Sequence, residues 1–265
     1  MPVTTRQGDA LYWDRQGRGP ALILGAGLGG VGNYWTPNMA ALTQHFTVYR
    51  FDQRGTGQSC RTPVASIEQM SADLVAVMDD AGLERAMYLG HSTGGAIGVA
   101  TALDHPGRLS AMMIYASTTC GDPYRRKILG LRSRLYGELG IAAYAQYSSL
   151  LLYPPYWINA HEQEIAEAEA ATTGQLENAE VQDSRFDAIL NFDRRDELSR
   201  IAIPTLVVCA DDDILTPKYF SEEFVRLIPG ARAYWAARGG HALSRTEPDL
   251  FARIAIDFFQ GVSAS

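Results

Sequence analysis

Short apolar runs recur along the chain, and most are followed by a polar or glycine-rich turn and a segment of helical periodicity. Six of these runs predict strands at residues 21–24, 46–51, 86–89, 110–115, 204–210 and 231–237. Several are apolar throughout, as expected of strands that are covered on both faces. Residues 2–14 predict an edge hairpin of two further strands. The pattern therefore predicts an α/β fold with a mostly parallel, eight-stranded sheet and helices on both faces.

The segment 118–200 interrupts this alternation, because strand signals are absent from it. Apolar residues recur there at helical spacing, and residues 161–180 are acidic and alanine-rich, which is typical of a helix surface. Strands and helices alternate again beyond it. We therefore expect a core made of residues 1–119 and 201–265, with an inserted helical cap of residues 120–200 that lies over the sheet.

Composition narrows the choice of partners. The net charge of −7 and the isoelectric point near 5.3 argue against a nucleic-acid-binding protein, which usually presents a basic face. Residues 1–7 show no signal-peptide pattern, and no stretch approaches the roughly 20 apolar residues of a membrane span. The three cysteines are odd in number and far apart, so they predict reduced thiols rather than disulfides or a zinc site. We expect a cytoplasmic protein with a small-molecule substrate and neither metal nor cofactor. The oligomeric state is left open, with a homodimer as one alternative.

The segment Gly90-His91-Ser92-Thr93-Gly94 lies between a predicted strand and a predicted helix, and it matches the nucleophile-elbow pattern G-x-S-x-G. In such a turn the serine backbone is strained and its neighbours at two positions before and after must be small. The serine hydroxyl then projects above the sheet beside a helix N-terminus. Ser92 is therefore the candidate nucleophile.

A serine nucleophile needs a base within hydrogen-bonding reach, and five histidines compete for that role. Four of them stand at helix ends, inside the elbow or in the insertion: His45, His91, His105 and His161. Only His241 lies on a loop between the last strand and the last helix, after two glycines that leave room for a turn. His241 is the candidate base, and the alternative is a capping histidine on a surface loop.

The base in turn needs an acid that orients it. Three adjacent carboxylates follow the strand that ends near Ala210, and they are Asp211, Asp212 and Asp213. We favour Asp213, because the apolar pair after it can anchor the loop while its side chain turns inward. Asp212 is the second choice, and Asp122 is a remote alternative.

An oxyanion needs two N–H donors, of which one comes from the residue after the nucleophile, Thr93. The second is expected in the glycine-rich loop 25–30, where the backbone N–H of Leu28 is the candidate. Gly25-x-Gly27-x-x-Gly30 also matches a dinucleotide-binding fingerprint. An acidic residue is expected about 20 positions after that fingerprint, and Asp52 comes late, so this second interpretation is disfavoured.

Together these motifs resemble the α/β-hydrolase family along nearly the whole chain. The matching segments are Gly90 to Gly94, Asp52 to Ser59, Asp213 with Pro217, and Gly240-His241. The resemblance implies a Ser92–His241–Asp213 triad, with a helical cap that determines the substrate. It departs from the family pattern at Ala26-Gly27, where the family often has His-Gly.

A closer similarity, to the aminoacrylate or carbamate hydrolases of bacterial uracil degradation, involves the cap as well. It is carried by Gly27-Leu28-Gly29-Gly30, Tyr34-Trp35 and, in the insertion, Leu151-Leu152-Tyr153-Pro154 with Trp157. It implies hydrolysis of a small C–N substrate. A carboxylesterase or lactonase that uses the same residues stays open, and a non-catalytic ligand-binding protein is the remote alternative.

Two groups of side chains in or near the cap are candidates for substrate contacts. The aromatic candidates are Trp35, Tyr153 and Trp157. The basic candidates share one predicted helix and are Arg125, Arg126, Arg132 and Arg134. These arginines either recruit a carboxylate or form a solvated helix surface.

Overall fold

Eight strands form one sheet in the order β1-β2-β4-β3-β5-β6-β7-β8 in the computed structural model, which describes residues 3–6, 8–173 and 178–263. The strands are β1 (Val3–Arg6), β2 (Asp9–Gly17), β3 (Ala21–Gly25), β4 (Thr47–Phe51), β5 (Ala86–His91), β6 (Leu109–Tyr115), β7 (Thr205–Ala210) and β8 (Arg232–Ala236). The β1–β2 and β2–β4 pairs are antiparallel, and all the other pairs are parallel. The predicted α/β fold with a mostly parallel, eight-stranded sheet is confirmed.

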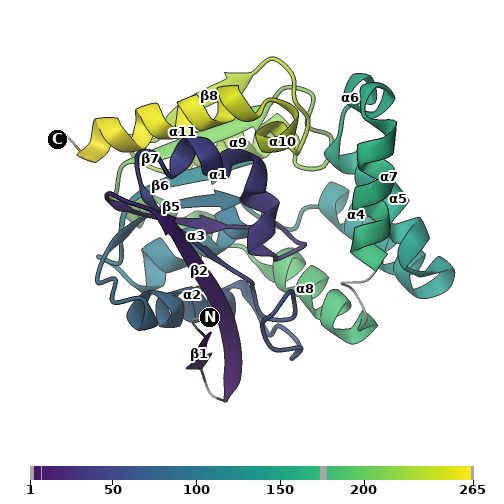
Figure 1. Ribbon diagram of the computed structural model, residues 1–265, viewed down its shortest axis with the longest axis horizontal. Helices are drawn as coiled ribbons and strands as arrows, with labels where there is room; N and C mark the ends of the chain where they lie inside the picture. The colour runs from purple at the N-terminus through teal and green to yellow at the C-terminus, as the bar shows by residue number, and fades with distance from the viewer. Residues whose placement is uncertain (1–2, 7, 174–177, 264–265) are drawn as a thin grey trace.

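Helices cover both faces of this sheet (Figure 1). One face is covered by α1 (Thr36–Leu42) and α11 (Pro248–Ser263), and the other by α2 (Ile67–Asp80), α3 (Thr93–Asp104) and α9 (Lys218–Leu227). The short elements of the core are η1 (Gly32–Trp35), η3 (Arg195–Arg200) and α10 (Leu243–Thr246).

Strand β5 shows why the central strands are apolar throughout. Successive side chains of a strand point to opposite faces. Met87 and Leu89 belong to the hydrophobic cluster under α1 and α11, whereas Tyr88 belongs to the cluster under α2 and α3. Since both faces are covered, every position of β5 is buried. The carboxyl end of β5 is thereby held rigidly in the middle of the sheet.

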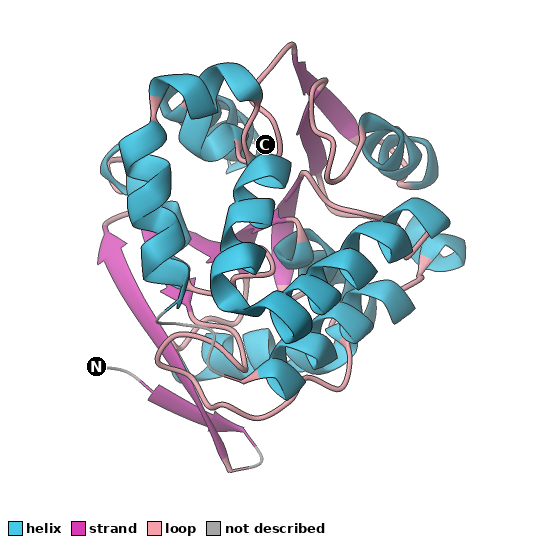
Figure 2. Cartoon of the chain, turned by 90° about the vertical axis from the view of Figure 1, so that its right-hand side faces the viewer, coloured by secondary structure: helices cyan, strands magenta, loops and turns pink. Residues whose placement is uncertain are grey.

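Between β6 and β7 the described chain contains helices and no strand of the sheet. These elements are α4 (Pro123–Arg134), η2 (Leu135–Leu139), α5 (Gly140–Leu152), α6 (Pro155–Ala160), α7 (Glu162–Thr173) and α8 (Ala179–Asn191). They face the viewer in Figure 2, to one side of the sheet in Figure 1. The helix expected over 161–180 corresponds to the whole of α7 and the start of α8, and residues 174–177 lie outside the described part.

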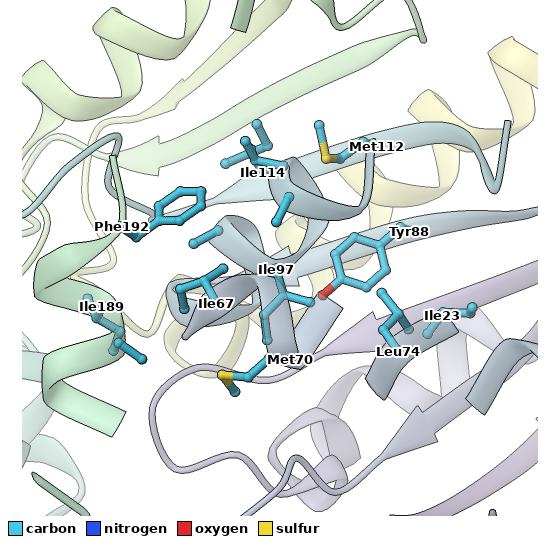
Figure 3. Close-up of a cluster of buried hydrophobic side chains, with 14 of the residues drawn as sticks. Ile23, Ile67, Met70, Leu74, Tyr88, Ile97, Met112, Ile114, Ile189 and Phe192 are labelled. Carbon is cyan, nitrogen blue, oxygen red and sulfur yellow. The ribbon is translucent and has the colours of Figure 1, made fainter. Parts of the chain in front are cut away.

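The insertion is packed onto the core rather than joined to it only by the chain. Ile189 of α8 and Phe192, just after it, belong to the same buried cluster as Ile67 of α2 and Ile114 of β6 (Figure 3). This shared apolar contact fixes α8 beside the carboxyl edge of the sheet. None of the described helices is both long enough and apolar enough to cross a bilayer.

Candidate active site

Ser92 occupies the sharp turn between β5 and α3. Its backbone has φ 52° and ψ −114°, a region that costs a non-glycine residue about 1–3 kcal/mol. Gly90 and Gly94 approach one another and the Gly25 carbonyl so closely that neither has room for a Cβ atom. The small residues two positions before and after Ser92 are therefore a steric requirement of this turn.

Hydrogen bonds on three sides hold the strained turn. The backbone N–H of Ser92 donates to the Tyr115 carbonyl at 2.8 Å, which extends the pairing of β5 with β6. The Ser92 carbonyl accepts from Ser117 Oγ at 2.7 Å and from the Gly95 N–H at 2.9 Å. The turn is thus tied to the neighbouring strand and to its own helix, while the Ser92 side chain lines a cavity.

His241 and Asp213 form a buried pair. His241 Nδ1 donates to Asp213 Oδ2 at 2.9 Å, and both side chains are almost fully buried. Asp213 also accepts from the N–H groups of Leu215 and Thr216 at 2.8 and 2.9 Å, and from Thr216 Oγ1 at 2.7 Å. These donors satisfy the buried carboxylate oxygens, and they fix the orientation in which the carboxylate meets the imidazole.

The other candidate acids have different partners. Asp211 forms an exposed ion pair with Lys218, and Asp212 accepts from the Gly240 N–H at 2.8 Å. Asp122 caps helix α4 by accepting from the Arg125 N–H. Of the four aspartates considered, only Asp213 contacts the His241 ring.

Hydrogen bonds to the sheet, to the elbow and to the inserted segment hold the His241 loop. The His241 carbonyl accepts from Tyr115 Oη at 2.7 Å and from His91 Nε2 at 3.1 Å. The next N–H, that of Ala242, donates to the Leu152 carbonyl at the end of α5. His241 is therefore positioned by β6, by the elbow and by the insertion together.

His91 has a structural surrounding rather than a reactive one. Its ring stacks between Tyr34 and Tyr115, with centroids 4.7 and 4.6 Å away. Complete burial, together with the neighbouring His241, holds the pKa of His91 well below its usual value. Its Nε2 donates to the His241 carbonyl and the ring stays neutral, so the role of His91 is to support the His241 loop.

The glycine-rich loop after β3 lies against the elbow. A Cβ atom on Gly27 would lie 3.3 Å from Ser92 Cβ, so the close approach implied by the glycines is to the elbow. Leu28 and Thr93 both line the cavity beside Ser92. Within the described chain, the backbone N–H of neither residue donates a hydrogen bond. Two free N–H groups beside a serine can stabilise an oxyanion.

Arg185 of α8 is a residue that the sequence pattern does not single out. It is buried, and its guanidinium donates to the Leu28 carbonyl through Nε at 3.1 Å and Nη2 at 2.8 Å. It also donates to the Arg54 carbonyl and to Gln53 Oε1, while Gln53 Nε2 donates to the Ala26 carbonyl. The loop of Leu28 is thus held by an arginine 157 residues away in the chain, and no local sequence signal could have identified it.

Ser92, Thr93, Leu28 and His241 line one cavity of about 390 Å³ between the sheet edge and the insertion. Among the predicted aromatic contacts, Tyr153 lines this cavity. Within the described residues, the cavity lining includes neither Trp35 nor Trp157, so these two expectations need correction.

The two tryptophans are displaced for identifiable reasons. Trp35 is fully buried against Phe251, and its neighbour Tyr34 faces the cavity instead, because successive residues of a helical turn point in different directions. Trp157 stacks behind Tyr153, with ring centroids 4.6 Å apart. Tyr153 therefore occupies the inner position and Trp157 supports it.

The four arginines of α4 divide into two pairs. Arg126 and Arg134 are exposed, as a solvated helix surface requires. Arg125 and Arg132 are 3% and 6% exposed and line the cavity. The solvated-surface interpretation is therefore wrong for Arg125 and Arg132.

A group of three or more side chains that could hold a metal ion is absent from the described residues. The arrangement offers a strained serine, a histidine–aspartate pair and two free N–H groups around one cavity. This set of groups is suited to nucleophilic attack on an electrophilic carbon.

Comparison with known proteins identifies hydrolases of the same fold. The family model described as alpha/beta hydrolase fold matches residues 20–248. A carbamate hydrolase RutD, so named in Caulobacter sp. strain K31, is 36% identical over 263 residues, covering 97% of this chain and 98% of that protein. The crystal structure of an enol-lactonase from Burkholderia xenovorans LB400 superimposes with a TM-score of 0.90 at 25% identity, covering 98% of this chain and 100% of the other. A structure described as Est816, an N-acyl homoserine lactone degrading enzyme, has a TM-score of 0.82 at 25% identity, covering 97% and 100%.

Proposed function

Because the chain belongs to the α/β-hydrolase family and is a hydrolase, we propose that Ser92, His241 and Asp213 form its catalytic triad. We propose further that it cleaves the C–N bond of a small substrate, aminoacrylate or carbamate, in pyrimidine degradation. The single observation that supports the triad best is the buried His241–Asp213 hydrogen bond on the cavity that holds the strained Ser92.

The protonation pattern of His241 sets the direction of proton transfer. Nδ1 carries the proton that Asp213 accepts, so Nε2 has a free lone pair. In the proposed mechanism Nε2 takes the Ser92 proton while Oγ attacks the substrate carbon. Asp213 stabilises the imidazolium that forms. Where the attacked carbon bears an oxygen, as in carbamate, an ester or a lactone, the backbone N–H groups of Leu28 and Thr93 stabilise the oxyanion.

Breakdown of the tetrahedral intermediate completes the first half of the reaction. With carbamate, the imidazolium returns its proton to nitrogen, the C–N bond breaks, and ammonia leaves a carbonate ester on Ser92. Water then attacks that ester with His241 as base, releasing bicarbonate and restoring the serine hydroxyl. With an ester, the same steps release an alcohol in place of ammonia, and with a lactone they open the ring to a hydroxyl group that stays on the acyl chain.

The substrate assignment rests on similarity that includes the insertion. The relatives named RutD match this chain along nearly its whole length, and residues 120–200, which we propose act as a cap, carry part of that match. Tyr153 of this segment lines the cavity, and the Leu152 carbonyl binds the His241 loop. Both contacts support the proposal that this segment selects substrates.

A lactonase or carboxylesterase is the second candidate. It is favoured by the enol-lactonase and the N-acyl homoserine lactone degrading enzyme, which share the fold at 25% identity. Both candidate functions use the same triad, and they differ in the bond that is cleaved.

The decisive experiment compares the wild-type protein with Ser92→Ala on both substrate classes. Ammonia release from aminoacrylate and carbamate, above the uncatalysed rate, is measured beside hydrolysis of short acyl esters and lactones. We expect Ser92→Ala to lose about 10⁴- to 10⁶-fold in kcat. Ser199→Ala, at an exposed serine of η3, is the matched control and should keep full activity.

The pattern of activities separates the candidates. Fast turnover of esters or lactones with no ammonia release would replace the first function by the second. Undiminished turnover by Ser92→Ala would exclude covalent catalysis. Absence of any turnover by the wild-type protein would favour a ligand-binding role.

A further inference from the structure

Arg125 and Arg132 face the same cavity as Ser92. They stand seven residues apart on α4, which is two helical turns and places them on one face of the helix. Both are more than nine-tenths buried and both line the cavity. Two buried guanidinium groups therefore line the cavity that the proposed nucleophile also lines.

Each guanidinium is held by neutral partners that leave part of it free. Arg132 Nη2 donates to Tyr144 Oη at 2.7 Å and to Ser148 Oγ at 3.1 Å, and its charge lies over the Tyr144 ring at 4.9 Å. Arg125 Nη1 donates to the Leu215 carbonyl at 2.9 Å. The buried Nε atoms of both arginines have no hydrogen-bond partner within the described chain.

The two positive charges are not neutralised by the protein. Among the described residues, no carboxylate forms an ion pair with either arginine, and Glu169, which lines the same cavity, is no exception. The nearby Asp213 is bound to His241, and Asp122 caps α4. A buried charge without a counterion is costly, since it loses hydration that nothing replaces.

The pKa of Arg125 reflects the missing counterion. Burial, together with the like charge of Arg132, lowers the pKa of Arg125 to about 10. A lowered arginine pKa means that its environment disfavours the positive charge. An anion bound beside Arg125 in the cavity would oppose that effect.

We propose that Arg125 and Arg132 bind a carboxylate group of the substrate, separate from the carbon that Ser92 attacks. A planar guanidinium matches a carboxylate through paired N–H donors, and this match is strongest where water is excluded. The inference rests on the proposed hydrolase function of the same cavity, and it defines the substrate class as a small carboxylic acid with a second, reactive carbon.

This assignment discriminates between the candidate substrates. Aminoacrylate carries a carboxylate two carbons away from the carbon that bears nitrogen, so one end can bind the arginines while the other meets Ser92. Carbamate has a single carboxyl carbon, which is itself the reacting centre. The arginine pair therefore favours the aminoacrylate class over carbamate, and, for the second function, an acid-bearing lactone or ester over a neutral one.

The test uses two esters that differ in one charge. Hydrolysis of 4-nitrophenyl hemisuccinate, which carries a free carboxylate, is compared with that of 4-nitrophenyl butyrate. The readout is the ratio of the two kcat/KM values. We expect the wild-type protein to prefer the hemisuccinate, and Arg132→Gln to lower the ratio about 10- to 100-fold, the range expected when a hydrogen bond to a charged group is lost.

Two further variants make the result specific. Arg132→Lys keeps the charge without the planar fork and should lower the ratio by a smaller factor, which also covers the case that Arg132→Gln does not fold. Arg126→Gln removes an exposed charge from the same helix and should leave the ratio as in the wild-type protein. An unchanged ratio in folded Arg132→Gln would overturn the carboxylate site.

A binding measurement separates this inference from the proposed function. Calorimetry with succinate on Ser92→Ala requires no turnover, and binding that is lost in Ser92→Ala/Arg132→Gln supports the site even if the triad proposal fails. The carboxylate site would be overturned if inorganic phosphate bound in place of succinate, or if succinate bound equally well with and without Arg132. Loss of ester hydrolysis in Ser92→Ala combined with no charge preference would leave the triad standing and refute the arginine site.

Discussion

At the scale of single residues, burial and hydrogen bonding distinguish side chains that are chemically identical. Asp211, Asp212 and Asp213 are consecutive, yet one faces solvent and Lys218, one caps the glycine turn before His241, and one meets the imidazole. The carboxylate that meets the imidazole accepts four hydrogen bonds, which compensate for its burial.

Substituting the acid tests this distinction. Asp213→Asn should lower kcat about 10⁴-fold, because an amide in place of the carboxylate favours the wrong histidine tautomer. Asp212→Asn keeps an oxygen acceptor for the Gly240 N–H and should stay within a few-fold of the wild-type rate. Steady-state kinetics on whichever substrate is turned over checks both variants, and the reverse order of effects would transfer the role to Asp212.

At the scale of elements, helix α8 supports a loop that belongs to a distant part of the chain. The apolar face of α8 packs on the core through Phe186 and Ile189, which fixes the position from which Arg185 reaches the Leu28 carbonyl. Burial, which is not offset by any carboxylate among the described residues, lowers the pKa of Arg185 to about 10. Its neutral partners show that Arg185 acts by holding backbone in place.

Arg185→Lys is expected to weaken the oxyanion site more than substrate binding. A lysine cannot donate to three acceptors in the same plane, so the Leu28 N–H loses its fixed direction. We expect kcat to fall about 10- to 100-fold, less than the full loss of one oxyanion donor, with little change in KM.

A boronic acid that forms a tetrahedral adduct with Ser92 should lose affinity in parallel with kcat, which a purely structural defect would not require. Asp187→Asn, at an exposed position of the same helix, is the control. If KM rises while kcat and boronate affinity stay constant, Arg185 does not position the donor.

At the scale of the whole molecule, the site depends on parts of the chain that meet only in the folded state. The His241 carbonyl is held by Tyr115 of β6 and by His91 of the elbow, and the next residue binds Leu152 of the insertion. A neutral, buried His91 lies at the centre of this contact. The stability of the fold is therefore linked to the protonation of one histidine.

The pH dependence of stability should reveal His91. In the unfolded chain a histidine binds a proton below about pH 6.5, whereas the folded protein disfavours that proton because the pKa of His91 is lowered. The unfolded state then binds more protons, so the free energy of unfolding is highest above pH 6.5 and falls by at most about 1.4 kcal/mol per pH unit as the pH decreases.

Urea denaturation between pH 5 and 7 measures this slope, and His91→Gln should flatten it while lowering stability at pH 7. His45→Gln, at an exposed histidine, serves as the control and should keep the wild-type slope. An equally steep decline in His91→Gln would assign the effect to other groups.

Much of the fold and part of the site could be predicted from local patterns. The elbow is recognisable because a positive φ at Ser92 and the close packing around Gly90 and Gly94 require specific residues at fixed spacing. The choice of Tyr34 over Trp35 as a cavity residue depends on helical phase after a glycine-rich loop, which periodicity over so few residues cannot determine.

The sequence by itself determined the alternation of strands and helices, the mostly parallel sheet, and the order in which serine, aspartate and histidine occur. Those features follow from periodicity and turn chemistry, which act over a few neighbouring residues. Only the tertiary structure decided that Arg125 and Arg132 line the same cavity as Ser92 and that Arg185 holds the Leu28 loop. These contacts join residues that are far apart in the chain, and they arise because burying apolar faces of α4 and α8 carries their arginines inward.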